Sequence, residues 1–409
     1  MTHDQPRELA RRSLLRAAGS AVLAGSALYA AAPLSFAESG APAAGQSDAT
    51  ASAAAAGGKL PLTVVNHSGT HNNSAVHVYI VGTNPAGKQV HVNHAGKAVP
   101  IALSDNGANG FTDYALPLKA NGATHLHLPR MSGRIYVSMG RKLKFKVVRD
   151  GDGRPAIQHP AGWVSSDPNY HVLHDFAEFT YDGSGMHCNT TMVDMFSIPM
   201  NLRLTGRGHH TTGEVRKGGR ADVFKAMRRH EAFDRLVVKG LRVIAPSHGL
   251  DAGRFPKDYY HPYIEKVWDH YKQHDLTIKT NAGTFTGRVS GGRLTFHGPA
   301  TISFDKPTTR DILFCDGALL APNDGVLGPV AAVLGAGFNR STLLRAGAQP
   351  TARPAAFYQP TVTNHYARAI HSVVKNGKAY GFAFDDVANF ASYVEDPAPK
   401  RLQLTLTPF

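Results

Sequence analysis

The chain of 409 residues is long enough for one large or two medium domains, and 42% of its residues are hydrophobic, which allows a sizeable core. It contains 41 glycines and 25 prolines, and only 18% of its residues are charged, a composition that favours a loop-rich β protein over a helical bundle. The formal net charge of +14 would suit nucleic acid or an anionic cell-surface polymer, but the basic residues are scattered, so a solvated surface is the simpler interpretation. Two cysteines are too few for a disulfide-rich scaffold.

The N-terminal region has the pattern of an export signal. Arg11 and Arg12 precede a mildly apolar, Ala/Gly-rich run, which ends at the small-residue cleavage pattern of residues 35–37. We therefore predict that residues 1–37 are a signal peptide of the twin-arginine type, with an ordinary secretory signal as the alternative. Both predict a secreted or periplasmic protein. Residues 38–58, rich in Ala, Gly and Ser, are predicted to be a flexible linker, and no later stretch has the roughly 20 apolar residues of a membrane anchor.

The first part of the mature chain has the pattern of an all-β protein. Short β-branched runs, closed by Gly, Asn, Asp or Pro, follow one another at residues 59–69, 75–87, 110–118, 124–129, 133–140 and 142–153. Strands at this spacing predict an antiparallel sandwich or barrel.

The pattern changes after Met200. Apolar residues recur at helical spacing in residues 219–238, 258–274 and the end of 325–344, with a predicted strand at 241–249 between the first two. Further strands are predicted for residues 276–298, 301–307, 310–317, 378–396 and 401–409. The simplest architecture is mainly β: a β-barrel or sandwich domain from residues 59–202 and 311–409, with an α/β domain inserted at 203–310. A groove between two such domains is where ligands usually bind.

Two carboxylates lie in strand-like surroundings, where Asp and Glu are uncommon. They are Glu178 in "FAEFTY" and Asp194 in "TMVDMFSI". In a hairpin symmetric about Met186 they would face each other, with Cβ atoms about 4.5–5.5 Å apart and Thr180 on the same face. Because facing like charges destabilise a sheet, their presence suggests a use, and glycoside hydrolysis uses two carboxylates. The alternative is two solvated acids on an exposed face.

Other constellations give weaker signals. Adjacent Asp385 and Asp386 would point to opposite faces of a strand, so a strand-end turn is the simpler interpretation. His230-Glu231 lacks the second histidine of a helical zinc site, and we expect no metal and no cofactor. Cys188 and Cys315 would be a disulfide in an oxidising compartment or two inert thiols, and the disulfide is the better hypothesis.

A longer stretch identifies a family. The segment "DFAEFTYDGSGMHCNTTMVDMFSIP" (175–199) resembles the active-site stretch of glycoside hydrolase family sixty-four, and the resemblance extends over residues 60–409 through "SGRIYVSMG", "RVIAPSHGLDAGRF", "NHYARAIH" and "GKAYGFAFDDV". These are bacterial β-1,3-glucanases that release laminaripentaose. The resemblance implies a thaumatin-like β-barrel domain beside a mixed α/β domain, with a wide groove between them.

The resemblance also implies roles for single residues. Glu178 matches the general acid and Asp194 the general base of an inverting hydrolase, so the pKa of Glu178 should be raised and that of Asp194 low. Thr180 and Thr191 match positions that contact the glucan. At two positions the chain departs from the family, which tends to have Asn where Asp182 lies and a tryptophan platform where His187 lies. Groove-lining positions are matched by Tyr366 and by Asp385 or Asp386.

These implications predict a secreted, monomeric, endo-acting β-1,3-glucanase that inverts the anomeric carbon and acts on fungal-wall or storage glucan. The alternative is a thaumatin-like β-glucan-binding protein with little turnover, which the departure at His187 favours and the two carboxylates oppose. A cationic polymer binder is a third interpretation that rests on charge alone, and we expect no nucleic-acid partner.

Overall fold

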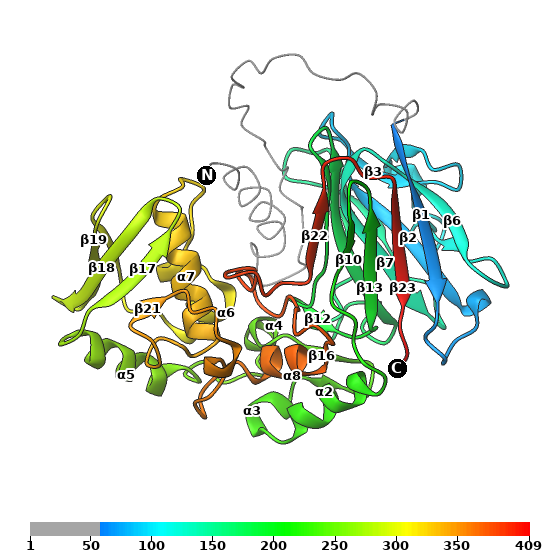
Figure 1. Cartoon of the computed structure of the whole chain (residues 1–409). Coiled ribbons are helices and arrows are strands. Elements are labelled where there is room, and N and C mark those ends of the chain that lie inside the picture. Colours follow the sequence, from blue (N-terminus) through cyan, green and yellow to red (C-terminus); the bar gives the residue numbers. More distant parts are fainter. Residues whose placement is uncertain (1–57) are drawn as a thin grey trace, which may run out of the picture.

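The computed structural model describes residues 58–409 (Figure 1). The predicted signal peptide, and the predicted linker up to residue 57, lie outside the described residues. Two parts lie side by side in Figure 1: a sandwich lobe, formed by an eight-stranded and a five-stranded sheet, and an α/β lobe, formed by residues 215–390. A short three-stranded sheet joins the lobes. Within residues 58–409, no helix is both long and apolar enough to cross a membrane.

The sandwich lobe contains a five-stranded and an eight-stranded sheet. The first has the order β14 (His209–Thr211), β13 (Met200–Thr205), β23 (Arg401–Leu406), β1 (Lys59–Asn66) and β6 (Thr124–Pro129). The second has the order β22 (Tyr393–Asp396), β11 (Gly185–Thr190), β10 (Leu173–Asp182), β7 (Met131–Met139), β2 (Val76–Thr83), β3 (Gln89–Val92) and β4 (Ala98–Pro100), with β5 (Leu116–Pro117) on β2. The last strand of the chain, β23, therefore lies beside the first, β1, and the two are parallel.

The core of the sandwich follows from alternation along the strands. Ala177, Phe179 and Tyr181 of β10 belong to the apolar cluster that fills the space between the two sheets. Because side chains alternate across a strand, Glu178 and Thr180 lie on the outer face of the eight-stranded sheet. A smaller apolar cluster, which includes Tyr136 and Phe176, covers part of that outer face. A hairpin of β8 (Lys146–Arg149) and β9 (Pro155–Gln158) contributes to it.

The α/β lobe contains seven helices within the described residues: α2 (Gly219–Arg228), α3 (Glu231–Asp234), α4 (Pro246–Asp251), α5 (His261–Tyr271), α6 (Thr309–Phe314), α7 (Leu327–Asn339) and α8 (His365–Val373). Its sheet has the order β20 (Ile302–Phe304), β19 (Arg293–His297), β18 (Gly283–Ser290), β17 (Leu276–Thr280) and β21 (Ala348–Gln349). The strands that join the lobes are β12 (Met195–Phe196), β16 (Arg242–Ile244) and β15 (Val237–Val238). Short 3-10 helices are η1 (Asn73–Ala75), η2 (Leu103–Asp105), η3 (Gly317–Leu319) and η4 (Pro354–Ala356).

The predicted second domain boundary is wrong. Helices α6, α7 and α8 share one apolar cluster with α5, so residues 311–390 pack in the α/β lobe, and only β22 and β23 return to the sandwich. The predicted strand at 310–317 is α6, because the side chain of Thr308 and that of Asp311 cap its first turn. Of the predicted strand at 378–396, only β22 forms.

A close approach of two strands gives a test of the fold. Gly133 of β7 pairs with Gly82 of β2, and a Cβ atom at position 133 would lie 2.2 Å from the carbonyl oxygen of Val81. We predict that Gly133→Ala lowers the free energy of unfolding by about 1–3 kcal/mol, because backbone must move to admit the methyl group. Denaturant unfolding measures this. Gly151→Ala, which would have nothing within 4 Å, is the matched control. Equal stability of the two variants would contradict the strand approach.

Candidate active site

The hairpin that carries Glu178 differs from the predicted one. Glu178 pairs with Asn189 rather than with Asp194, and Met186 pairs with Tyr181 instead of forming the centre of the turn. The turn comes earlier because the carboxylate of Asp182 accepts hydrogen bonds from both the backbone N–H and the hydroxyl of Ser184, at 2.8 and 2.6 Å. The predicted facing of the two carboxylates across one hairpin is therefore wrong.

The two carboxylates nevertheless meet, at Arg134. This arginine of β7 lies directly opposite Glu178 of β10. Its Nη2 is 3.1 Å from Glu178 Oε1 and 3.9 Å from Oδ2 of Asp194, which precedes β12. Both acidic residues are only 4% exposed. Since both oxygens contact one nitrogen atom, they are at most about 7 Å apart. The two carboxyl groups are therefore close enough to act on one glycosidic bond.

Arg134 is itself held in place from several sides. Its guanidinium lies over the ring of Phe176, 4.2 Å from the centroid, and its Nη1 donates to the Tyr136 hydroxyl at 3.3 Å. That hydroxyl is also 3.1 Å from Nδ1 of His159. A cation that is fixed by stacking and hydrogen bonds fixes the position of the carboxylate with which it pairs.

The α/β lobe contributes the partner of Asp194. Nε2 of His248, on α4, donates to Asp194 Oδ1 at 2.7 Å, and its ring stacks on Trp163 with centroids 4.2 Å apart. The backbone N–H of Ala245 donates to the Asp194 carbonyl at 3.0 Å. The site is therefore assembled where the lobes meet, with Glu178 and Arg134 from the sandwich and His248 from the α/β lobe.

The surroundings shift the pKa values of the two carboxyl groups in opposite directions, as predicted. Burial raises the pKa of Glu178, and the charge of Asp194 adds to this against the opposing effect of Arg134. Burial also disfavours the charge on Asp194, but the hydrogen bond and charge of His248, with Arg134, outweigh it and lower the pKa of Asp194. One carboxyl therefore keeps its proton to higher pH and the other remains ionised, which is how acid and base roles are separated.

The predicted glucan-contacting residues near the hairpin lie on this side of the sheet. Thr180 is buried and pairs with His187, and Thr191 is buried in the segment before Asp194. His187 is 9% exposed, and both of its ring nitrogens have partners: Nε2 is 3.0 Å from the Ser184 hydroxyl, and Nδ1 is 2.7 Å from the Tyr393 hydroxyl and 3.3 Å from a carboxylate oxygen of Glu395. Asp182 is linked to this network through Ser184.

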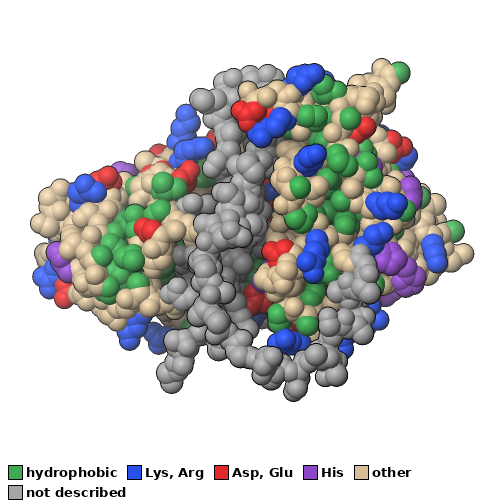
Figure 2. Space-filling model, turned by 90° about the horizontal axis from the view of Figure 1, so that it is seen from above, with side chains coloured by type: hydrophobic (Ala, Val, Ile, Leu, Met, Phe, Trp, Pro, Cys, Tyr) green, Lys and Arg blue, Asp and Glu red, His purple; other side chains and the backbone are tan. Residues whose placement is uncertain are grey.

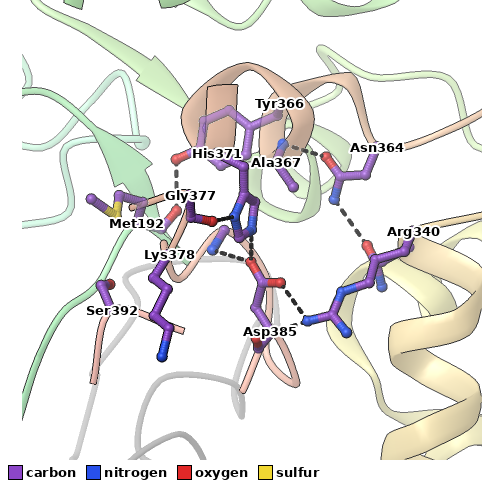
Figure 3. Close-up of polar contacts among 12 residues, drawn as sticks. Met192, Arg340, Asn364, Tyr366, Ala367, His371, Gly377, Lys378, Asp385 and Ser392 are labelled. Atoms are coloured by element: carbon purple, nitrogen blue, oxygen red, sulfur yellow. Dashed lines mark hydrogen bonds and ion pairs between the residues drawn. The ribbon is translucent and has the colours of Figure 1, made fainter. Parts of the chain in front are cut away.

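Two residues that were expected to line the groove are fully buried. The Tyr366 hydroxyl donates to the Met192 carbonyl at 2.6 Å. Asp385 is bound by Arg340 and His371, at 2.9 and 2.8 Å (Figure 3). Both are 0% exposed, so neither contacts a ligand directly, and that prediction is wrong for them. Asp386 is half-buried.

The predicted disulfide does not form. Cys188 and Cys315 are both free and buried, and they belong to different apolar clusters, because Cys188 faces the sandwich core. Burial raises the pKa of both thiols, which makes them unreactive. Among residues 58–409, no group of three or more His, Cys, Asp or Glu side chains is placed to hold a metal ion. Figure 2 shows lysines and arginines dispersed over the visible face, which favours the solvated-surface interpretation of the net charge.

Opposite pKa shifts predict opposite effects on stability. A raised pKa means that the contribution of Glu178 to stability is present below its unfolded pKa, about 4.3, and is lost as the pH rises through its folded pKa. Glu178→Gln should therefore raise the melting temperature near pH 8, by roughly 2 °C or more, and the gain should vanish towards pH 4. Asp194 contributes above its unfolded pKa, about 3.9, and loses this as the pH falls through its folded pKa.

Asp194→Asn should accordingly lower the melting temperature near pH 8, and the loss should shrink only below about pH 4. Thermal unfolding followed by circular dichroism from pH 3 to 8 measures both effects. Glu231→Gln removes a carboxylate whose side chain is 91% exposed and serves as the control, with little change at any pH. Shifts of the same sign for both variants near pH 8 would contradict the pKa directions.

Comparisons with known proteins point to one family. The family model described as beta-1,3-glucanase, that of glycoside hydrolase family sixty-four, matches residues 58–406. Glucan endo-1,3-beta-glucosidases of Cellulosimicrobium cellulans and of Arthrobacter sp. (strain YCWD3) are each 36% identical over 299 residues, which is 69% of this chain and 54% of each relative. The chain thus spans about half the length of the curated relatives it matches.

Solved structures show the same likeness. A laminaripentaose-producing beta-1,3-glucanase, crystallised in complex with laminaritetraose, is 38% identical with a TM-score of 0.77, and the match covers 86% of this chain and 99% of that one. A beta-1,3-glucanase domain from Clostridium beijerinckii is 29% identical with a TM-score of 0.75, and the match covers 86% and 98%. The chain belongs to glycoside hydrolase family sixty-four.

Proposed function

We propose that this protein is an endo-acting β-1,3-glucanase that hydrolyses fungal-wall or storage glucan with inversion and releases short laminari-oligosaccharides. The observation that carries the proposal is the pair of buried carboxylates joined by Arg134, with pKa values shifted apart in the directions that an acid and a base require. The substrate class is supported by family membership and by the related structure that contains laminaritetraose.

The reaction needs one proton donor and one proton acceptor. Protonated Glu178 donates to the glycosidic oxygen as the bond from that oxygen to the anomeric carbon breaks. Ionised Asp194 accepts a proton from a water molecule, whose oxygen attacks the anomeric carbon from the opposite face. The products are an alcohol and a new reducing end of inverted configuration, and exchange with solvent returns the proton from Asp194 to Glu178.

Two neighbouring residues stabilise the negative charges that Glu178 and Asp194 carry during the reaction. Arg134, 3.1 Å from Glu178, stabilises the carboxylate that Glu178 becomes when it gives up its proton. His248 donates to Asp194 at 2.7 Å, which orients the carboxylate and leaves its other oxygen available for water. Both roles depend on burial, because an ion pair is stronger where water is excluded.

Glucan contacts are proposed on the same face of the sheet. Thr180 and Thr191 supply hydroxyl groups for sugar hydroxyls, while Asp182 and His187, held by their own network, form a polar edge. The half-buried Tyr393 ring beside His187 offers an apolar face for a sugar ring. Half-buried Asp386 remains a candidate for the groove. We further propose that residues 1–37 direct export and that the mature protein acts as a monomer outside the cytoplasm.

The catalytic assignment predicts a loss of turnover without a loss of binding. Glu178→Gln and Asp194→Asn should each lower kcat by roughly 10²–10⁴-fold on linear β-1,3-glucan, because each removes one proton-transfer partner. Reducing-end assays measure turnover, and calorimetry with laminari-oligosaccharides should show little change in Kd. Glu231→Gln should behave as the wild type. If the wild type binds glucan without releasing products, the protein is a glucan-binding module and the proposal is wrong.

The hydrogen bond from His248 to Asp194 predicts how the pH profile of activity should shift when His248 is replaced. His248→Phe keeps an aromatic ring against Trp163 but removes the donor to Asp194, so the pKa of Asp194 should rise. Because the base must be ionised, the acidic limb of kcat/KM against pH should move upwards by roughly one unit or more, as expected for a hydrogen bond to a charged group. His230→Phe, another stacked histidine, is the control. An unmoved acidic limb would show that His248 does not set the ionisation of Asp194.

A further inference from the structure

The segment that carries Asp194 has no regular secondary structure, although a catalytic base needs a fixed position. Residues 191–194 follow β11 without helix or strand. Besides the bond from Ala245 to the Asp194 carbonyl, backbone groups of this segment and of Thr190 before it bind residues 366–392. Thr190 N–H donates to the Ser392 carbonyl at 3.2 Å, and the Ser392 hydroxyl donates to the Thr190 carbonyl at 2.6 Å.

Both backbone polar groups of Met192, two residues before Asp194, are hydrogen-bonded. Its N–H donates to the Tyr380 carbonyl at 2.8 Å, and its carbonyl accepts from the Tyr366 hydroxyl at 2.6 Å. Figure 3 shows Tyr366 reaching from α8 to Met192. Burial raises the pKa of Tyr366, so the hydroxyl keeps the proton that it donates.

The loop that supplies Tyr380 and Ser392 is organised by a buried charge cluster. Arg340 donates to both the side chain and the carbonyl of Asp385, at 2.9 and 2.8 Å, and to the Val387 carbonyl at 2.8 Å. His371 donates to the other oxygen of Asp385 at 2.8 Å, and its Nδ1 is 2.7 Å from the Gly377 carbonyl.

One helix contributes both to the charge cluster around Asp385 and to the hydrogen bonds of Met192. Tyr366 and His371 both lie on α8, so the same helix holds the Met192 carbonyl and one side of Asp385 (Figure 3). The N–H of Gly381, next to Tyr380, donates to Asp385 at 2.9 Å. Asp385 therefore fixes Gly381, and the adjacent Tyr380 carbonyl in turn binds the backbone N–H of Met192.

We propose that Tyr366 and Asp385 are positioning residues that set the location of Asp194, and the inference rests on the proposed function. Asp194 has two supports from the α/β lobe: His248 on α4 binds its carboxylate, and Tyr366 on α8 binds the Met192 carbonyl two residues before it. Arg134 of the sandwich lobe lies 3.9 Å from the same carboxylate. If the second support loosens, the 2.7 Å bond to His248 lengthens and the attacking water is misplaced. A misplacement of about 1 Å can cost roughly 10²-fold in rate.

The test compares two buried tyrosines that make the same kind of bond. Tyr366→Phe removes the donor to Met192, and Tyr271→Phe removes a donor to the Leu343 carbonyl within the α/β lobe. Both side chains are 0% exposed. Both variants should lose a similar amount of thermal stability. Only Tyr366→Phe should lower kcat, by about tenfold or more with KM within about twofold, and raise the acidic limb of the pH profile.

Equal kinetics for the two variants would overturn the proposal. Should Tyr366→Phe fail to fold, Asp385→Asn decides in its place, because it keeps the shape of the side chain and removes the charge that Arg340 and His371 bind. It should lower kcat relative to Tyr271→Phe, and an unchanged kcat would overturn the proposal. If the wild type does not hydrolyse glucan, the proposed function fails, and the proton NMR signal of His248 Nε2–H, assigned by its loss in His248→Phe, tests the positioning alone. A signal that moves in Tyr366→Phe and not in Tyr271→Phe supports it, and a signal unmoved in both overturns it.

Discussion

The site depends on one guanidinium between two buried carboxylates. Arg134 can approach both because Glu178 lies opposite it on the neighbouring strand while Asp194 comes from outside the sheet. Two ionised carboxylates and one arginine would leave a net negative charge in a site that is almost closed to water. The raised pKa of Glu178 favours its protonated form, which relieves this charge, and the proton is the one that the proposed reaction donates to the leaving oxygen.

The two carboxylates are held in place in different ways by the two lobes. Glu178 sits in the middle of a central strand, where the pairing of β10 with β7 and β11 fixes its backbone. Asp194 lies in an irregular segment and obtains its position from side chains, chiefly His248. A rigid sheet thus holds the proposed acid, and a set of buried hydrogen bonds from the α/β lobe holds the proposed base.

The sequence predicts features that depend on neighbouring residues better than contacts between residues far apart in the chain. Glu178 is recognisable in the sequence because an acidic residue in an apolar strand is unusual, and Arg134 in "SGRIYVSMG" is likewise a charged residue within an apolar, strand-like run. Asp194 was identified through a hairpin that does not form, since a two-residue turn at Gly183–Ser184 shifts the register. His248 is one of 22 histidines, and only the fold brings it to Asp194.

The errors have similar physical causes. The family resemblance implies groove positions for Tyr366 and for Asp385 or Asp386, whereas Tyr366 and Asp385 have core partners that come from distant segments of the chain. The boundary at residue 310 failed because an apolar run preceded by a capping box was taken for a strand. Local signals such as caps were in the sequence, but the partners of buried polar groups were not.

The most direct test of the account is the configuration of the first products. Purified protein would be incubated with linear β-1,3-glucan while proton NMR follows the anomeric signals before mutarotation equilibrates them. The account predicts that α-anomeric reducing ends form first, because Asp194 directs water to the face opposite the bond that Glu178 protonates. Initial β-anomeric products would contradict the proposed use of Glu178 and Asp194, since they would require a covalent intermediate on one of the two carboxylates.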